Sequence, residues 1–151
     1  MMIVSACLAG FPCRYDGKSK PCAEVVELVK AGKAIPVCPE QLGGLPTPRP
    51  PCEILAGRVV DRNGTDRTES FQQGAQAVLA LAQTYGATQA LLQNRSPSCG
   101  TGWIYDGTFS KTLIAGDGIT ARLLQENGIQ DRKSTRLNSS HPTTSRMPSS
   151  A

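Results

Sequence analysis

The sequence predicts a small single-domain α/β fold of three layers, with a mostly parallel sheet between helices. Short apolar segments of strand composition alternate with segments of helical periodicity, which is typical of strand–helix–strand units. Polar or Gly- and Pro-rich loops follow the carboxyl ends of the expected strands. The length of 151 residues suits one hydrophobic core, and 5% aromatic residues require a core of Val, Leu, Ile and Ala.

The first half of the chain contains two expected strands and one helix. Residues 2–7 form an apolar run with β-branched side chains, as in a buried strand. Pro21 begins a helix whose apolar stripe continues to Gly32, and residues 34–38 form the second strand. Residues 39–51 hold five prolines and two glycines, so we expect only a long loop there.

The second half begins with a small hairpin at 53–61, in which Ala56-Gly57 makes the turn. A long helix starts at Thr68 and is closed by Gly86. A third buried strand follows at 88–93. The remaining segments are a loop at 94–118 with a short strand near 103–109, a helix at 119–127 and the first residues of a strand at 129–130.

Residues 131–151 do not read as part of this domain. Nine of the 21 residues are Ser or Thr, and such a segment buries too little apolar surface to offset the entropy of ordering it. The run DRKSTRLNSSH also resembles one translated frame of a sequencing-library adapter. We therefore expect a domain at 1–130 with a truncated natural C-terminus, followed by a disordered, artefactual tail at 131–151.

Several classes of protein are disfavoured by composition. No apolar run approaches the roughly 20 residues of a membrane span, and no secretory signal is visible, so we expect a cytoplasmic protein. Residues 1–130 carry 12 basic and 11 acidic side chains, which indicates no nucleic-acid-binding surface. The single histidine, His141, lies in the tail, so a Ser-His or Cys-His pair and His-ligated zinc are excluded from the domain.

Cysteines are the prominent reactive residues of the domain. Because the carboxyl ends of parallel strands share one sheet edge, where α/β proteins bind ligands, cysteines at or beyond these ends should converge there. The spacing includes no C-x-x-C motif, and all-sulfur ligation would suit either an iron–sulfur cluster or zinc. Cys22 and Cys52 are better explained as buried structural thiols. The four candidate ligands are Cys7, Cys13, Cys38 and Cys99.

Other polar side chains are expected at the same edge. Glu40 lies two residues beyond Cys38, Arg49 lies in the proline-rich loop, and Arg95, Ser96 and Ser98 immediately precede Cys99. Without histidine, acid–base chemistry would depend on a group such as this carboxylate.

Three long motifs in the same order resemble one known family. They are SACLAGFPCRYDG at 5–17, VCPEQLGGLPTPRPP at 37–51, and RSPSCG with IYDGTF within 95–109. The family was first known only as a domain of unknown function, number 523, and its characterised members are thiouracil desulfidases. The resemblance extends from Ile3 to about Ile129.

The resemblance implies non-redox removal of sulfur from thiolated pyrimidines, either 2- or 4-thiouracil or a thio-nucleotide, with release of hydrosulfide. It also implies a 4Fe–4S cluster held by only three of the four candidate cysteines. Glu40 and Ser96 match the positions expected for acid–base and substrate-binding roles. Arg49, Arg95 and Ser98 would contact the substrate.

Two alternatives from other classes remain at this stage. One is a non-catalytic regulatory module that binds zinc or a cluster. The other is a sulfur-transfer partner in tRNA thiolation. The sequence does not define the oligomeric state.

Overall fold

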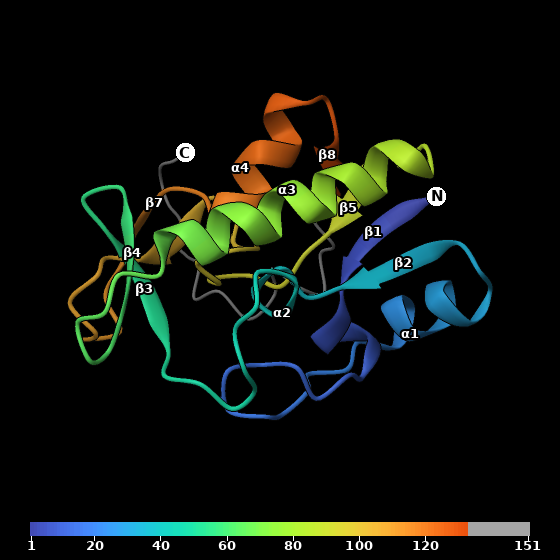
Figure 1. Ribbon diagram of the computed structural model, residues 1–151. Coiled ribbons are helices and arrows are strands. Elements are labelled where there is room, and N and C mark those ends of the chain that lie inside the picture. Colours follow the sequence, from blue (N-terminus) through green and yellow to red (C-terminus); the bar gives the residue numbers. More distant parts are fainter. Residues whose placement is uncertain (133–151) are drawn as a thin grey trace.

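The centre of the fold is a sheet of four parallel strands in the order β2–β1–β5–β8 (Figure 1). The structure, a computed structural model, describes residues 1–132. The strands are β1 (Met2–Ser5), β2 (Ala34–Val37), β5 (Gln89–Leu91) and β8 (Gln130–Asp131). The prediction of an α/β domain with a mostly parallel sheet is confirmed.

Helices cover both faces of this sheet. Val4 of β1 points to the face covered by α1 (Ala23–Lys30), and the neighbouring Ile3 points to the face covered by α3 (Thr68–Thr84) and α4 (Ile119–Glu126). Figure 1 shows α3 and α4 on one side of the sheet and α1 on the other. The alternation of side chains along the central strand therefore builds two cores and three layers.

Two antiparallel hairpins lie outside the central sheet. The first pairs β3 (Cys52–Leu55) with β4 (Arg58–Asp61) through the expected turn at Ala56-Gly57, where φ is 50° and 80°. Positive φ at both central residues is the geometry of tight hairpin turns. The second pairs β6 (Trp103–Tyr105) with β7 (Leu113–Ala115). We predicted a strand near β6 but not β7, because β7 is a three-residue strand with little periodicity.

The expectation of an uninterrupted loop over 39–51 is wrong, because the loop begins with a short helix, α2 (Pro39–Leu42). Cys38 is the N-cap of α2, and Pro39 occupies the first helical position. Proline is tolerated there because that amide has no partner within the helix. The helix places Glu40 in its first turn, directly after strand β2.

Two glycines let α2 pack directly on the backbone of α3. A Cβ atom at Gly74 would lie 1.9 Å from the carbonyl oxygen of Pro39, and one at Gly43 would lie 2.0 Å from that of Ser70. Such distances leave no room for any side chain at either position. The long helix of the core thus fixes the position of the short helix that carries Glu40.

The last strand includes one residue of the expected tail. Asp131 completes β8, and its Oδ2 accepts a hydrogen bond of 2.8 Å from the hydroxyl of Thr101. Arg132 donates to Glu24 of α1 at 3.0 Å. The rest of the expected tail, residues 133–151, lies outside the described residues. Within 1–132, no helix is long and apolar enough to cross a membrane.

Candidate active site

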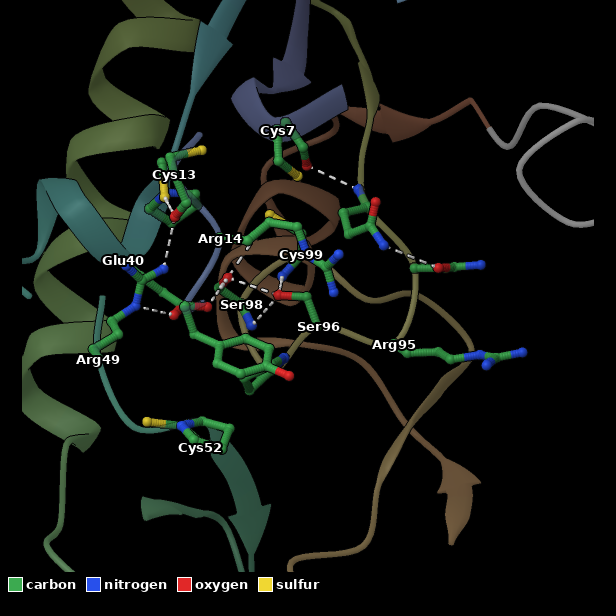
Figure 2. A pocket seen from close by; sticks show the side chains of 18 of the residues that line it. Cys7, Cys13, Arg14, Glu40, Arg49, Cys52, Arg95, Ser96, Ser98 and Cys99 are labelled. Carbon is green, nitrogen blue, oxygen red and sulfur yellow. Dashed lines mark hydrogen bonds and ion pairs between the residues drawn. The ribbon is translucent and has the colours of Figure 1, made fainter. Parts of the chain in front are cut away.

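A pocket of about 460 Å³ opens at the carboxyl-terminal edge of the parallel sheet. Its walls come from the segments that follow β1, β2 and β5, together with residues of both hairpins. Figure 2 shows how side chains from these segments converge on it. The location agrees with the expectation for open α/β sheets, in which ligands bind beyond the carboxyl ends of the strands.

All four candidate cysteines line this pocket. Cys7 lies on a short 3₁₀ helix, η1 (Ala6–Ala9), which ends the first expected strand at Ser5 rather than at residue 7. Cys13 is in the following loop, and its carbonyl oxygen accepts a hydrogen bond of 3.6 Å from the thiol of Cys38. Cys99 arrives from the turn after β5. All four are free thiols.

The pKa values of three of these thiols are raised. A hydrogen bond with Cys38 acts to lower the pKa of Cys13, but a hydrogen bond with Cys7 and burial outweigh it and raise that pKa to about 11. A hydrogen bond with Cys13 and burial raise the pKa of Cys38. Burial raises the pKa of Cys99 to about 12, against hydrogen bonds with Ser5 and Ser98. At neutral pH these thiols would lose their protons only to a bound cation.

Two kinds of metal site use all-sulfur donor sets such as this one. Among residues 1–132, no three His, Cys, Asp or Glu side chains are close enough together to hold one metal ion. Around a zinc ion each sulfur lies about 2.3 Å from the same centre. In an iron–sulfur cluster each thiolate binds a different iron, so the sulfurs stand farther apart. All four thiols line one cavity and come from three loops, so the pocket offers the all-cysteine donor set that iron–sulfur clusters use.

The other two cysteines lie apart from this group. Cys22 is not among the residues that line the pocket; it is the N-cap of α1 and packs, half-buried, against the core. Cys52 does line the pocket, but Figure 2 shows it beyond Arg49, at the far end from Cys7 and Cys99. Burial, with the charges of Glu40 and Asp61, raises the pKa of Cys52 to about 12.

Glu40 is held between a buried arginine and a buried serine. Its Oε1 accepts a hydrogen bond of 2.9 Å from Nε of Arg49, and its Oε2 accepts one of 3.1 Å from the hydroxyl of Ser98. The side chain of Arg49 is 4% exposed and that of Glu40 is 13% exposed. Both carboxylate oxygens therefore have fixed directions, and the carboxylate lines the pocket close to the cysteines.

Arg49 uses its whole guanidinium group to fix the loops around Glu40. One terminal nitrogen donates to the carbonyl of Pro46 at 3.1 Å and to the hydroxyl of Thr47 at 2.8 Å. The other donates to the carbonyl of Cys13 at 3.0 Å. The sequence suggested that Arg49 contacts substrate, but in the structure all three of its nitrogens already have protein acceptors. Through its hydrogen bonds to Glu40 and to the carbonyl of Cys13, Arg49 connects α2 to the loop that contains Cys13.

Replacing Arg49 with methionine should destabilise the protein by about 3–5 kcal/mol, because Glu40 would remain buried without its counter-charge. Urea unfolding would measure this loss. Arg58→Met is the matched control, since Arg58 forms an exposed ion pair of the same length, 2.9 Å, with Asp66 and should cost less than about 1 kcal/mol. Equal losses in the two variants would contradict this role for Arg49.

Ser96 and Ser98 form a chain of hydroxyl groups that ends on Glu40. The Ser98 hydroxyl donates to Glu40, so the Ser96 hydroxyl, 2.9 Å away, donates to Ser98. The oxygen of Ser96 also accepts from the amides of Ser98 and Cys99 at 3.1 and 3.0 Å. The turn before Cys99 is thereby fixed by the same side chain that begins the hydroxyl chain.

Arg95, unlike Ser96 and Ser98, does not point its side chain toward Glu40. Its φ of 63° is unusual for a residue with a side chain. It lines the pocket, but its labelled side chain in Figure 2 extends away from Glu40 and Ser98. Its Nε is buried without a hydrogen-bond partner among the described residues.

Several pocket residues escaped the sequence analysis. They lie on the hairpins and the first loop, and their residue types alone do not distinguish them from ordinary surface residues. The charged members are Arg14, Lys20, Glu53, Arg62 and Lys111, and the aromatic members are Tyr15, Tyr105 and Phe109. Two motifs were available signals: SACLAGFPCRYDG contains Arg14 and Tyr15, and IYDGTF contains Tyr105 and Phe109.

Comparison with known proteins connects this pocket to one family. A family model described as 2-thiouracil desulfurase matches residues 2–134. The uncharacterized protein YbbK of Bacillus subtilis (strain 168) is 41% identical over 148 residues, which cover 91% of this chain and 98% of that protein. A solved structure of TudS, a [4Fe-4S]-dependent thiouracil desulfidase, is 46% identical with a TM-score of 0.85, covering 91% of this chain and 93% of that one. The chain belongs to the 2-thiouracil desulfurase family.

Proposed function

We propose that this protein hydrolyses the carbon–sulfur double bond of thiolated pyrimidines and releases the sulfur as hydrosulfide. The observation that carries the proposal is the meeting, in one pocket, of four free thiols with a carboxylate and two linked hydroxyls. The relative TudS is described as [4Fe-4S]-dependent and as acting on thiouracil. We infer the same cofactor here, bound by three of Cys7, Cys13, Cys38 and Cys99.

The donor set of the pocket supports this cofactor. The candidate ligands are all sulfur, and iron–sulfur clusters are characteristically bound by cysteine thiolates. With three cysteine ligands, the bound cluster supplies one iron free to act as a Lewis acid toward a soft thiocarbonyl sulfur. The fourth cysteine would then remain in the wall of the pocket without binding the cluster.

Glu40 is the group that moves protons in this proposal. Its carboxylate accepts a proton as water adds to the ring carbon, and then returns a proton as the carbon–sulfur bond breaks. The balance is one water consumed, one thiocarbonyl converted to a carbonyl, and one hydrogen sulfide released. Arg49 orients the carboxylate through Oε1, and Ser98 and Ser96 deliver or remove a proton at Oε2.

The pocket carries more basic than acidic side chains. Its volume of about 460 Å³ would be shared between the cluster and the substrate. Five basic side chains of the lining form no ion pair with any described residue, namely Arg14, Lys20, Arg62, Arg95 and Lys111. This excess of positive charge favours a thiolated nucleotide, whose phosphate it would attract, over the free base.

Anaerobic reconstitution followed by a sulfide-release assay tests the proposal. We expect a brown protein that frees sulfide from thiolated pyrimidines. The substrates to compare are 2-thiouracil, 4-thiouracil and the 4-thio nucleotide, and the basic lining predicts the highest kcat/KM for the nucleotide.

The alternatives give different results in the same assay. A zinc-binding module would be colourless and would release nothing. A cluster-binding regulatory module would be brown but inactive. A sulfur-transfer partner would pass sulfur to an acceptor without freeing sulfide from the base.

A further inference from the structure

Glu53 is a buried carboxylate with no role in the chemistry described above. It lies on β3, is 8% exposed, and lines the pocket. Its Oε1 accepts two backbone hydrogen bonds of 3.0 Å, from the amides of Gly107 and Phe109. Both amides belong to residues 106–112, the turn that joins β6 to β7 and is called the 106–112 turn below. One carboxylate oxygen thus ties the second hairpin to the first.

The backbone of the 106–112 turn rests directly on β3. A Cβ atom at Gly107 would lie 2.7 Å from Cβ of Leu55 and 2.9 Å from the carbonyl oxygen of Ile54. Gly107 also has a φ of 95°, which a side chain would disfavour. Figure 1 shows the two hairpins together at one end of the molecule. The 106–112 turn is therefore held against β3 in two ways, by the close packing of Gly107 and by the hydrogen bonds to Glu53.

Two residues of the turn have backbone conformations that need such support. Phe109 has a φ of 59° and Lys111 a φ of 63°, both in the sparsely populated left-handed region. Residues persist there when their surroundings over-determine them. Phe109 and Lys111 both line the pocket, and the guanidinium of Arg62 lies 5.6 Å from the centre of the Phe109 ring. The turn thus presents an aromatic and a basic side chain to the pocket.

We propose that Glu53 is a positioning residue, which holds the 106–112 turn in place so that Phe109 and Lys111 form a substrate-binding wall of the pocket. This inference rests on the proposed function, because it concerns the substrate of that reaction. Neither Phe109 nor Lys111 is hydrogen-bonded to Glu40 or to its partners Arg49 and Ser98, so we assign the wall to substrate binding rather than to the chemical step. Loss of the wall should raise KM and leave kcat unchanged.

The test compares Glu53→Leu with Glu53→Gln in the cluster-loaded protein. Leucine cannot accept the two amide hydrogen bonds, whereas glutamine keeps a carbonyl oxygen at the same place. For Glu53→Leu we expect KM for the 4-thio nucleotide to rise about tenfold with kcat within about twofold of wild type. Glu53→Gln should restore KM. Hydrogen exchange, followed by mass spectrometry over 106–112, should be faster in the leucine variant and near wild type in the glutamine variant.

Phe109→Ala and Gly107→Ala are two further variants for this test. Glu27→Gln on α1 is the charge-matched control, because Glu27 is exposed and does not line the pocket. Phe109→Ala should raise KM without altering exchange, since the turn keeps its amide contacts. Gly107→Ala should reproduce both effects of Glu53→Leu, and it serves as the test if the leucine variant does not fold.

Unchanged exchange and unchanged KM in Glu53→Leu and Gly107→Ala would overturn the proposal. A fall in kcat at constant KM would also overturn it, because that result would place Glu53 in the chemical step. If wild-type protein releases no sulfide, the proposed function fails instead. The exchange measurement still reports on the 106–112 turn in that case, and unchanged protection in both variants would reject the role of Glu53 by itself.

Discussion

Glu40→Gln will lower the rate of sulfide release by about 10²–10⁴-fold, the range that general acid–base steps contribute. Glutamine has almost the shape of glutamate but cannot take up a proton at neutral pH. It keeps one oxygen, so it can accept a hydrogen bond from either Arg49 or Ser98, but not from both as Glu40 does. The proton transfer is lost, and the pocket keeps its walls.

The measurement is steady-state sulfide release per cluster, with cluster content taken from the brown absorbance of each preparation. Ser98→Ala is the companion variant, because it removes the hydroxyl chain while leaving the carboxylate and Arg49 in place. We expect a smaller loss of activity from Ser98→Ala than from Glu40→Gln.

Wild-type turnover by Glu40→Gln with an intact cluster would exclude Glu40 as the base. Glu53 is the one other carboxylate among the described residues that line the pocket, and the role would then pass to it or to a bound hydroxide.

Serine substitutions of the four pocket cysteines will show which three bind the cluster and which one does not. For three of the single variants at Cys7, Cys13, Cys38 and Cys99 we expect complete loss of the brown chromophore and of sulfide release, because a hydroxyl does not replace a thiolate toward iron. The fourth variant should keep its colour. Iron and sulfide content per protein, measured beside absorbance, checks the result.

Two serine variants serve as controls for this series. Cys22→Ser removes the thiol at the N-cap of α1, and Cys52→Ser removes one that lines the pocket beyond Arg49. Both should retain the chromophore. Retention of colour in all four pocket variants, or its loss in Cys52→Ser, would contradict the assignment of the cluster to the strand-end cysteines.

The parts of the site that follow from strand ends could be predicted from the sequence. Cys7 and Cys38 come just after strands and Cys99 lies in the loop that follows β5, and parallel topology brings such positions to one edge. Glu40 was found for the same reason, two residues beyond Cys38. These inferences needed only the order and direction of the elements. The assignment of chemical roles to these residues remains a prediction.

Contacts that depend on how loops fold over one another could not be predicted in this way. The partners of Arg49 lie up to 36 positions away, at Cys13, and no local pattern encodes that pairing. Likewise, Glu53 meets Gly107 and Phe109 across more than 50 residues. The short helix α2 was missed because it opens the segment 39–51, whose prolines and glycines are typical of loops, although Pro39 at a first helical position is compatible with a helix.

The glycine contact between α2 and α3 has a consequence for attempts to engineer this protein. Replacing a helical glycine by alanine is a common stabilising change, worth about 0.4–1 kcal/mol where the backbone accepts it. Gly74 sits in the middle of the longest helix and would be an obvious choice for such a design. Its new methyl group, however, would meet Pro39, the residue between Cys38 and Glu40. Gly43 and Gly74 should therefore be held constant in any thermostabilisation library, which can be directed to the solvent-facing positions of α3 instead.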